Sequence, residues 1–420
     1  MELLNERLKK IEKEVFIMAE KMVKISEKLK GNVARSVNPY GCKQEVLNQI
    51  DYVKKQGHYN GAKKALIIGG SSSYGLASRV TQAFGSGADT ICVAYERPVK
   101  DETMLGTAGW WNNIYFKQEA EKAGLIAKNF NGDAFTKEIK QQVLDYIKDE
   151  FGGQIDLLVY SVAAPKRVNP ENPDEVWRSQ MKPVGKSVTG YNVNLEKNEL
   201  FEQTVESATK EETDATVHVM GGEDWELWVS MLKEAGVLAE GFKTILYSYI
   251  GSPVTYDFYH EGTLGKAKDA AEESSHKIQK NIDDLNGKAW ISVSKAVTTK
   301  ASVVIPIFPV YCIALYKIMQ EKGTHETPIM HKDRLFRDMV YGNKPEIDDR
   351  GRLRPDAWEQ DEDTQKKTVA LMKQITPENF NSDLTGYATF RKEFMQLNGF
   401  EVDGADNDTV DYDEITKLEP

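Results

Sequence analysis

The sequence contains few cysteines and histidines, and none of them is in a metal-binding arrangement. Its three cysteines, Cys42, Cys92 and Cys312, are far apart and form no C-x-x-C pair. This number and spacing exclude a disulfide framework and favour a reducing compartment. His325 and His331 are separated by a spacing that does not place both on one helix face. We therefore expect no metal site.

The sequence also lacks a long apolar run and an excess of positive charge. Its most apolar segment, residues 305–315, is broken by prolines and is shorter than the roughly 20 residues that a membrane-spanning helix needs. Charged residues run through the N-terminus, unlike in a signal peptide. The net charge of −11 argues against nucleic acid or an anionic membrane as the main partner. These features predict a cytoplasmic protein.

The first thirty residues have a heptad pattern of apolar side chains. The pattern has two interpretations: a coiled coil that makes the protein a homo-oligomer, or one amphipathic helix that packs on its own domain. In both, residues 1–30 are expected to be helical. The apolar positions are Leu4, Leu8, Ile11, Val15, Met18, Met22, Ile25 and Leu29.

From about residue 62, short apolar runs alternate with helical patterns. Such alternation predicts βαβ units and a doubly wound parallel sheet of the Rossmann-like, short-chain-dehydrogenase-related α/β class, with helical additions. Strands are expected at 65–68, 90–94, 125–129, 155–160 and 243–249, and helices at 75–84, 112–123, 136–150, 224–235 and 264–282.

Two segments depart from this alternation. Residues 165–215 are rich in Asn, Pro, Lys and Glu, which indicates an insertion of loops and short strands. Helical patterns continue to about residue 342, and the tail that follows is polar. We expect residues 31–420 to form one Rossmann-like domain, with a helical region at about 223–342 on its substrate side.

A glycine- and serine-rich turn follows the first predicted strand. Residues 69–75 read Gly-Gly-Ser-Ser-Ser-Tyr-Gly and precede a helix pattern. Such a turn lets the backbone approach a pyrophosphate, which the free N–H groups of the helix then bind. Glu96, just past the second strand, is placed to accept a hydrogen bond from a ribose 2′-hydroxyl, which favours NADH over NADPH. Arg97 leaves the alternative of a 2′-phosphate open.

Tyr259 and Lys268 are candidates for acid–base chemistry. A phenol donates protons, and a nearby ammonium lowers its pKa. Nine residues of continuous helix would place the two side chains on opposite faces, so the chain must be interrupted between them. Gly262 as a turn and Thr263 as an N-cap would supply this break. Tyr249, at the end of a predicted strand, either faces a ligand or packs in the core.

At this point the sequence resembles a known family, the trans-2-enoyl-CoA reductases and the related V-type enoyl-acyl-carrier-protein reductases. The resemblance covers about residues 33–420, and Tyr259 followed by eight residues and Lys268 matches the active-site signature of that family. It implies NADH-dependent reduction of the 2,3 double bond of a trans-2-enoyl-CoA or enoyl-acyl-carrier protein, without metal or flavin. Further landmarks are Asn38–Cys42, Tyr74–Arg79, Gly106–Trp110, Val219–Trp225 and Tyr247–Gly251.

The resemblance also implies a role for each site residue. Tyr259 is the expected proton donor, Lys268 binds the cofactor and Tyr249 contacts the substrate. The turn Gly69, Gly70, Ser71, Ser72, Ser73 and Tyr74 is expected to hold the pyrophosphate, Tyr95, Glu96, Asp133 and Ala134 the adenosine end, and Val162, Ala163, Val297, Thr298 and Thr299 the nicotinamide end.

Two features depart from the family pattern, and two rival functions remain. Ser73 stands where the family has glycine, which affects cofactor affinity, and the heptad segment is additional. A carbonyl–alcohol oxidoreductase of the short-chain dehydrogenase type would use the same cofactor turn but a Tyr-x3-Lys pair. A non-catalytic NADH-binding scaffold would not need Tyr259 and Lys268. Residues 305–315 are expected either to line an acyl pocket or, more simply, to form core.

Overall fold

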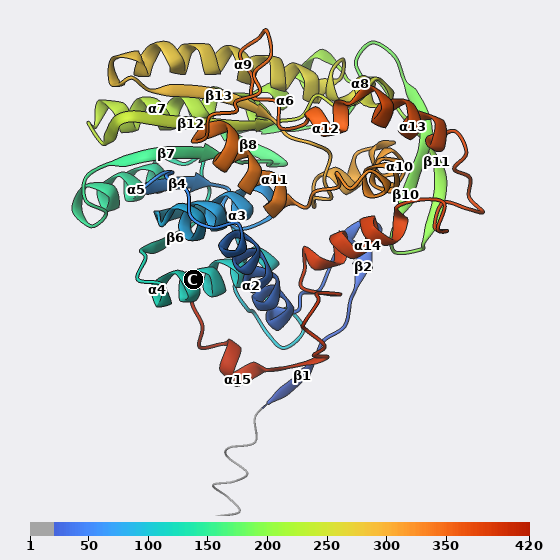
Figure 1. The fold of residues 1–420 in the computed structure, drawn as a ribbon, viewed down its shortest axis with the longest axis horizontal. Coiled ribbons are helices and arrows are strands. Elements are labelled where there is room, and N and C mark those ends of the chain that lie inside the picture. The colour runs from blue at the N-terminus through green and yellow to red at the C-terminus, as the bar shows by residue number, and fades with distance from the viewer. Residues whose placement is uncertain (1–20) are drawn as a thin grey trace, which may run out of the picture.

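The computed structural model describes residues 21–420 and contains a six-stranded parallel sheet (Figure 1). The strand order is β13-β12-β7-β4-β5-β6, so the winding direction reverses between β4 and β7. A crevice forms at such a reversal, outside the carboxyl ends of the strands. The predicted doubly wound sheet is therefore confirmed. Its strands are β4 (Lys64–Ile68), β5 (Asp89–Ala94), β6 (Ala127–Asn131), β7 (Ile155–Tyr160), β12 (Leu238–Ser248) and β13 (Lys288–Val293).

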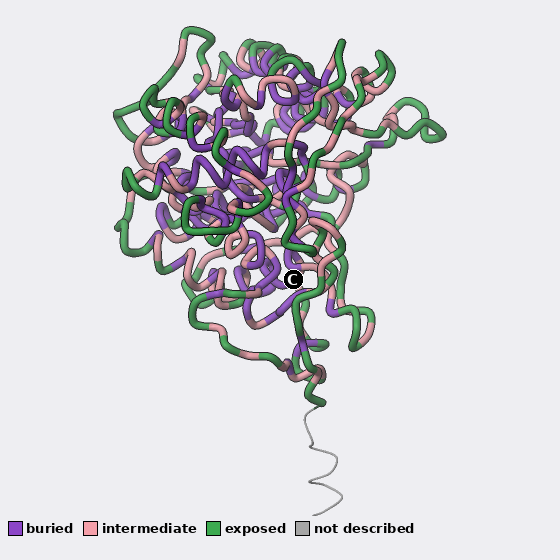
Figure 2. The backbone as a smooth tube through the Cα atoms, turned by 90° about the vertical axis from the view of Figure 1, so that its right-hand side faces the viewer, coloured by how far each residue is buried: buried purple, intermediate pink, exposed green. Residues whose placement is uncertain are grey.

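Helices cover both faces of this sheet, which explains why its strands are apolar without alternation. Leu66 and Ile68 on β4 pack with the helices of one face, and Ala65 and Ile67 pack with those of the other. Figure 2 shows the buried segments concentrated inside the molecule. The first face carries α5 (Lys137–Asp149), α7 (Glu223–Glu234) and α9 (Thr263–Ile282), and the second α3 (Ser73–Val80), η1 (Thr81–Gly85), α11 (Pro328–Arg334) and η5 (Leu335–Val340), with α2 (Pro39–Lys55) and α4 (Ala108–Lys122) packed beside them.

The sixth strand was not expected from the sequence. We predicted helical structure after residue 282, but β13 pairs with β12 over six residues. Its apolar run, Ala289–Ile291, is flanked by Lys288 and Ser292 and is too short for periodicity to separate strand from helix. The chain turns after α9 through η3 (Asp283–Leu285) and Asn286, which has a left-handed φ of 50°. The prediction was wrong because pairing with β12 decides this conformation.

Residues 165–215 form two antiparallel hairpins and the start of a helix. Figure 1 shows the second hairpin beside α10 (Phe308–Glu321) at the right of the molecule. Val193 and Leu200 belong to the same buried cluster as α10. The elements are β8 (Lys166–Asn169), β9 (Asn172–Arg178), β10 (Val188–Asn194), β11 (Glu199–Val205) and α6 (Lys210–Met220).

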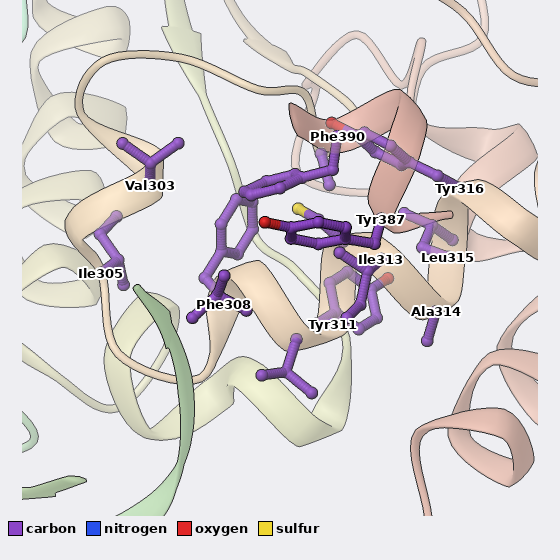
Figure 3. Packing of buried hydrophobic residues seen from close by; sticks show 14 of the residues in the cluster. Val303, Ile305, Phe308, Tyr311, Ile313, Ala314, Leu315, Tyr316, Tyr387 and Phe390 are labelled. Carbon is purple, nitrogen blue, oxygen red and sulfur yellow. The ribbon is translucent and has the colours of Figure 1, made fainter. Parts of the chain in front are cut away.

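The C-terminal tail is more than the polar segment that its composition suggests. Tyr387, Phe390 and Phe394 are buried and pack against α10. Figure 3 shows Tyr387 and Phe390 beside Tyr311 and Tyr316 of that helix. The apolar residues of the tail are too widely spaced to stand out from the charged ones between them. The tail forms α12 (Ala357–Gln360), α13 (Glu362–Met372) and α14 (Tyr387–Gln396).

The predicted N-terminal helix is wrong where the structure describes it. Residues 22–30 form β1 (Met22–Lys24) and β2 (Leu29–Lys30), which pair antiparallel with β14 (Thr409–Asp411) and β3 (Val33–Ala34). Residues 1–20 of the prediction lie outside the described residues. Val410, in β14, is fully buried, so tertiary pairing overrides the heptad pattern here. Figure 1 shows β1 next to α15 (Tyr412–Ile415). Within residues 21–420, no helix is long and apolar enough to cross a bilayer.

Candidate active site

A cavity of about 340 Å³ lies at the carboxyl ends of β4, β7 and β12. This is the place where the reversal of strand order predicts a ligand crevice. Eleven of the residues predicted to bind cofactor or substrate or to act in catalysis line it. They are Gly69, Ser72, Ser73, Tyr74, Val162, Ala163, Tyr249, Tyr259, Lys268, Val297 and Thr299.

The glycine-rich turn forms one wall of this cavity. A side chain at residue 69 would place its Cβ 2.1 Å from the carbonyl oxygen of Ser161, and one at residue 75 would lie 2.0 Å from the carbonyl oxygen of Gly69. Gly69 also has a φ of 81°. Only glycine fits at either position, and the turn brings the N-terminus of α3 to the cavity. This N-terminus suits an anion, because its N–H groups have no partners within the helix.

Ser73 is the residue of this turn that departs from the family pattern. Its φ is 49°, a left-handed conformation that β-carbon-bearing residues adopt at a cost. The Ser73 hydroxyl is buried and has no hydrogen-bond partner among the described residues. A buried hydroxyl without a partner at the wall of a cavity is suited to bind a ligand oxygen.

Glu96 lies against the outer side of the same turn. Its Oε1 accepts a hydrogen bond from the Ser71 hydroxyl at 2.6 Å, and its Oε2 accepts one from the Thr107 hydroxyl at 2.5 Å. Thr107 precedes α4, so the carboxylate joins the two segments that follow β4 and β5. The Tyr95 side chain next to it is 79% exposed. Both residues stand at the end of β5, outside the cavity.

The other predicted cofactor residues also lie outside the cavity. Asp133 and Ala134 form the turn between β6 and α5, where the Ala134 carbonyl accepts hydrogen bonds from Lys140 and Trp228. Thr298 does not line the cavity, and its hydroxyl interacts with the hydroxyl of Tyr316 at 2.9 Å. It lines a separate hollow of about 240 Å³, which Ser72 and Ser73 also border. Gly70 and Ser71, which belong to the same turn, do not line the cavity.

Tyr259 and Lys268 both line the cavity, and the chain is interrupted between them as predicted. The details differ from the prediction. Tyr259 ends a short helix, α8 (Tyr256–Tyr259), and the N-cap of α9 is Gly262. Thr263 is no cap, because its hydroxyl donates to the carbonyl of Gln180 at 2.5 Å. The sequence could not show this, because Gln180 is brought to α9 only by the tertiary fold.

Burial dominates the electrostatics of this pair. Burial raises the pKa of Tyr259 well above its usual value, with Cys312 and Tyr74 acting in the same direction. The expected lowering of this pKa by Lys268 is therefore wrong for the protein without ligands. Burial also lowers the pKa of Lys268 to about 8. Its Nζ donates to the carbonyl of Tyr247 at 3.3 Å, and within residues 21–420 it forms no ion pair.

Tyr249 packs directly on Tyr259. Their ring centroids are 4.5 Å apart in an edge-to-face arrangement, and Phe308 contacts both rings at 5.5 and 5.2 Å. Phe308 and Ile305 line the cavity, whereas the later residues of α10 are core. The simpler interpretation of residues 305–315, ordinary core, therefore holds for most of them, and an acyl pocket stays a prediction for Ile305 and Phe308. Burial raises the pKa of Tyr249 well above its usual value, and the nearby Glu359 adds to this shift.

Sequence reasoning missed two charged residues at this site. Lys295 follows β13 and lines the cavity, and Glu359, on α12, accepts a hydrogen bond from the Tyr249 hydroxyl at 2.9 Å. Both are fully buried. No local pattern marks either residue, because a single charged side chain in a short mixed segment has no period. Only their burial distinguishes them.

Family models match almost all of the described chain. Residues 24–101 match the NAD(P)H binding domain of trans-2-enoyl-CoA reductase, and residues 104–341 match the trans-2-enoyl-CoA reductase catalytic region. Residues 347–414 match a model described as an enoyl reductase FAD binding domain. The first two models contain the glycine-rich turn and the pair of Tyr259 and Lys268.

Similar proteins cover nearly the full chain. The enoyl-[acyl-carrier-protein] reductase [NADH] 2 of Photobacterium profundum is 48% identical over 93% of this chain and 98% of its own. The trans-2-enoyl-CoA reductase [NADH] of Clostridium beijerinckii is 48% identical over 94% of this chain and 99% of its own. The crystal structure of Clostridium acetobutylicum trans-2-enoyl-CoA reductase in complex with NADH matches with a TM-score of 0.91 and 46% identity. The match covers 94% of this chain and 100% of the chain in that structure. With these identities and matched family models, the chain belongs to the trans-2-enoyl-CoA reductase family.

Proposed function

We propose that this protein is an NADH-dependent enoyl-thioester reductase, which saturates the 2,3 double bond of trans-2-enoyl-CoA or enoyl-acyl-carrier protein. The observation that carries this proposal is the single cavity at the sheet reversal. It brings a phosphate-binding turn, two packed phenols and the Lys268 ammonium together. Family membership and the NADH named for the relatives support the same function.

The residues present fit NADH. The backbone approach at Gly69 leaves no room for a side chain, and the Ser73 hydroxyl is available to a phosphate oxygen. Glu96 would bind the ribose hydroxyls and repel a 2′-phosphate. Tyr95, Asp133 and Ala134 would flank the adenosine end, because they follow the adjacent strands β5 and β6. We assign the nucleotide to this turn and not to residues 347–414, which lie outside the parallel sheet.

Bound NADH would supply the hydride that the β-carbon of the substrate receives. Negative charge then develops on the thioester oxygen, and hydrogen bonds stabilise it most where the donors are already in place. Tyr259 would donate a hydrogen bond to this oxygen, and a proton from Tyr259 or from a water that it orders would then reach the α-carbon and complete the saturated thioester. Lys268 would bind the nicotinamide ribose. Tyr249 holds the Tyr259 ring at 4.5 Å and would contact the substrate.

The same proposal includes the organisation and location of the enzyme. Residues 31–420 would act as one reductase unit, with the insertion at 165–215 and the region at 223–342 on the substrate side. Val162, Ala163, Val297, Thr298 and Thr299 would enclose the nicotinamide end. A cytoplasmic location agrees with the three cysteines, which are free and buried.

The test is NADH oxidation with crotonyl-CoA by wild-type protein and by Tyr259→Phe. The variant should lose roughly 100-fold or more in kcat, the range for a general acid, with an unchanged Kd for NADH. Tyr256→Phe is the matched control, because it removes a phenol from the same helix where Tyr256 stacks on His260. That control should retain activity. Full activity in Tyr259→Phe would contradict the proposal.

The two rival functions make different predictions for these measurements. A carbonyl–alcohol oxidoreductase would reduce a ketone and leave crotonyl-CoA unchanged. A non-catalytic scaffold would bind NADH and turn over neither compound. Comparing kcat/KM for crotonyl-CoA with that for an enoyl chain on a carrier protein decides which thioester is preferred.

A further inference from the structure

Glu359 is a buried carboxylate that the C-terminal part of the chain places behind the cavity wall. Its exposed fraction is 0%. Oε1 accepts hydrogen bonds from the hydroxyls of Tyr249 at 2.9 Å and Tyr311 at 2.8 Å, and Oε2 accepts one from the N–H of Ala296 at 2.5 Å. This one side chain therefore joins the segments that follow β12 and β13 to α10.

Glu359 receives no hydrogen bond from a cation among the described residues. Lys295 is the nearby positive charge and favours the ionised carboxylate, but its Nζ donates to the carbonyls of Ala296 and Glu326. Burial outweighs the favourable contacts and raises the pKa of Glu359 to about 7. The titratable groups that face it are Tyr74 on α3, Tyr249 after β12, Tyr259 on α8, Lys295 after β13, Tyr311 and Cys312 on α10, and Asp356 before α12.

The ionisation state of Glu359 decides which hydrogen bonds Tyr249 can form. A phenol has one hydroxyl proton, and an ionised carboxylate can only accept. With Glu359 ionised, Tyr249 directs that proton away from the cavity. A protonated Glu359 must keep Oε2 as the acceptor for the Ala296 N–H, so it carries its proton on Oε1.

A proton on Oε1 would be donated to Tyr249 and not to Tyr311. The Tyr311 oxygen already accepts a hydrogen bond from the Gln365 amide at 2.9 Å. The Tyr249 oxygen accepts none from any described residue. Once Tyr249 accepts from Glu359, its own proton is free to point into the cavity.

We propose that Glu359 is a positioning residue, which determines whether Tyr249 donates its hydroxyl proton to Glu359 or to the thioester oxygen of the substrate. The inference rests on the proposed function and on the proposed contact of Tyr249 with substrate. With Glu359 protonated, Tyr249 and Tyr259 both donate to the developing enolate oxygen. With Glu359 ionised, only Tyr259 does. Loss of one such donor costs roughly 100-fold in rate.

Glu359→Gln tests this inference through the pH profile of kcat with crotonyl-CoA. The glutamine carbonyl would accept from Ala296, and its NH2 group would donate to Tyr249 at every pH. In the wild type, kcat should fall at least about tenfold as pH rises through about 7. Above this pH Glu359 is ionised, and Tyr249 donates its hydroxyl proton to Glu359 instead of to the substrate. The Glu359→Gln variant should keep its kcat through this range. A profile identical to that of the wild type would overturn the inference.

Glu45→Gln is the matched control. Burial also raises the pKa of Glu45 to about 7, but Glu45 interacts with Gln49 and not with Tyr249. Glu45→Gln should retain the fall of kcat near pH 7. If it removes that fall, the titrating group is not Glu359, and the inference is wrong.

Tyr249→Phe provides a test that does not depend on the folding of a Glu359 variant. Tyr249→Phe should reduce kcat and remove the fall of kcat near pH 7. Adding Glu359→Gln to this variant should then have no further effect on kcat. A Tyr249→Phe enzyme that keeps the fall would overturn the inference, as would equal effects of Glu359→Gln in both backgrounds. Failure of the proposed function is distinct, because the wild type would then not reduce crotonyl-CoA at any pH.

Discussion

Ser73 shows how one residue can act on stability and ligand binding in opposite directions. We expect Ser73→Gly to raise the free energy of unfolding by about 1 kcal/mol, because glycine adopts the left-handed φ of 49° without steric cost. The same change removes a hydroxyl proposed to bind a phosphate, so the Kd for NADH should rise roughly tenfold. Urea denaturation and NADH titration measure the two effects. Tighter NADH binding in the variant would contradict the proposed hydrogen bond.

Lys268 should give the activity a dependence on pH. Its charge is present below a pKa of about 8 and is lost as the pH rises through that value. The kcat/KM for NADH should therefore fall with rising pH around 8, because this ratio reports the titration of the free enzyme. Lys268→Met should have a lower kcat/KM without that fall. A fall that persists in Lys268→Met would assign it to another group.

For single residues, the sequence predicted where the backbone needs glycine better than it predicted which residues form hydrogen bonds with each other. Gly69 and Gly75 stand where the backbone leaves no room for a Cβ, as the turn pattern indicates. The N-cap predicted at Thr263 was wrong, because capping competes with Gln180, which lies far away in the sequence. Glu359 has no local signal, because the three donors that contact its carboxylate come from other segments.

At the scale of elements, helix α9 positions Lys268. This helix packs closely against Gly222, the residue before α7. A Cβ at residue 222 would lie 2.3 Å from Ser274 on α9. We expect Gly222→Ala to displace α9, lower the free energy of unfolding by roughly 1–3 kcal/mol and reduce kcat. Thermal unfolding and crotonyl-CoA reduction measure these effects.

A second substitution distinguishes crowding from other causes. Ser274→Gly removes the atoms that a Cβ at residue 222 would meet first. The double variant should therefore lose less stability than the sum of the two single variants. Additive losses would show that the contact between α7 and α9 is not the cause.

The elements themselves were predicted well where an apolar pattern spans the segment. This holds for β4, β5 and β7, which are continuous apolar runs, and for the helices α5, α7 and α9, along which a buried face repeats. Strand β13 was missed because Lys288 and Ser292 leave an apolar run of only Ala289–Ile291, shorter than the runs of β4, β5 and β7. The predicted helix at residues 22–30 is a pair of short strands, because β14 offers an edge that no local pattern reveals.

At the scale of the whole molecule, the two ends of the described chain stabilise each other. Val410 and Ile415 are buried with Ile25 and Trp111 in one cluster. Ending the chain at Asp408 should lower the free energy of unfolding by roughly 4 kcal/mol, the value of two buried aliphatic side chains. The kcat should remain near that of the wild type, because none of these residues lines the cavity.

Urea denaturation and crotonyl-CoA reduction below the Tm separate these two outcomes. The control is the full chain with Leu418→Ala, which packs beside this cluster without belonging to its buried residues. A truncated protein with wild-type stability would show that pairing of β1 with β14 contributes nothing.

The sequence by itself determined the sheet class and the glycine-rich turn, because apolar runs and glycines close together in the chain mark both. The pair of Tyr259 and Lys268 came from the resemblance to a known family, since nine residues of spacing alone do not bring two side chains together. Tertiary structure alone decided the sixth strand, the burial of the C-terminal helices and the contact of Glu359 with Tyr249. These features depend on pairing and desolvation between residues far apart in the chain, and no local spacing encodes them.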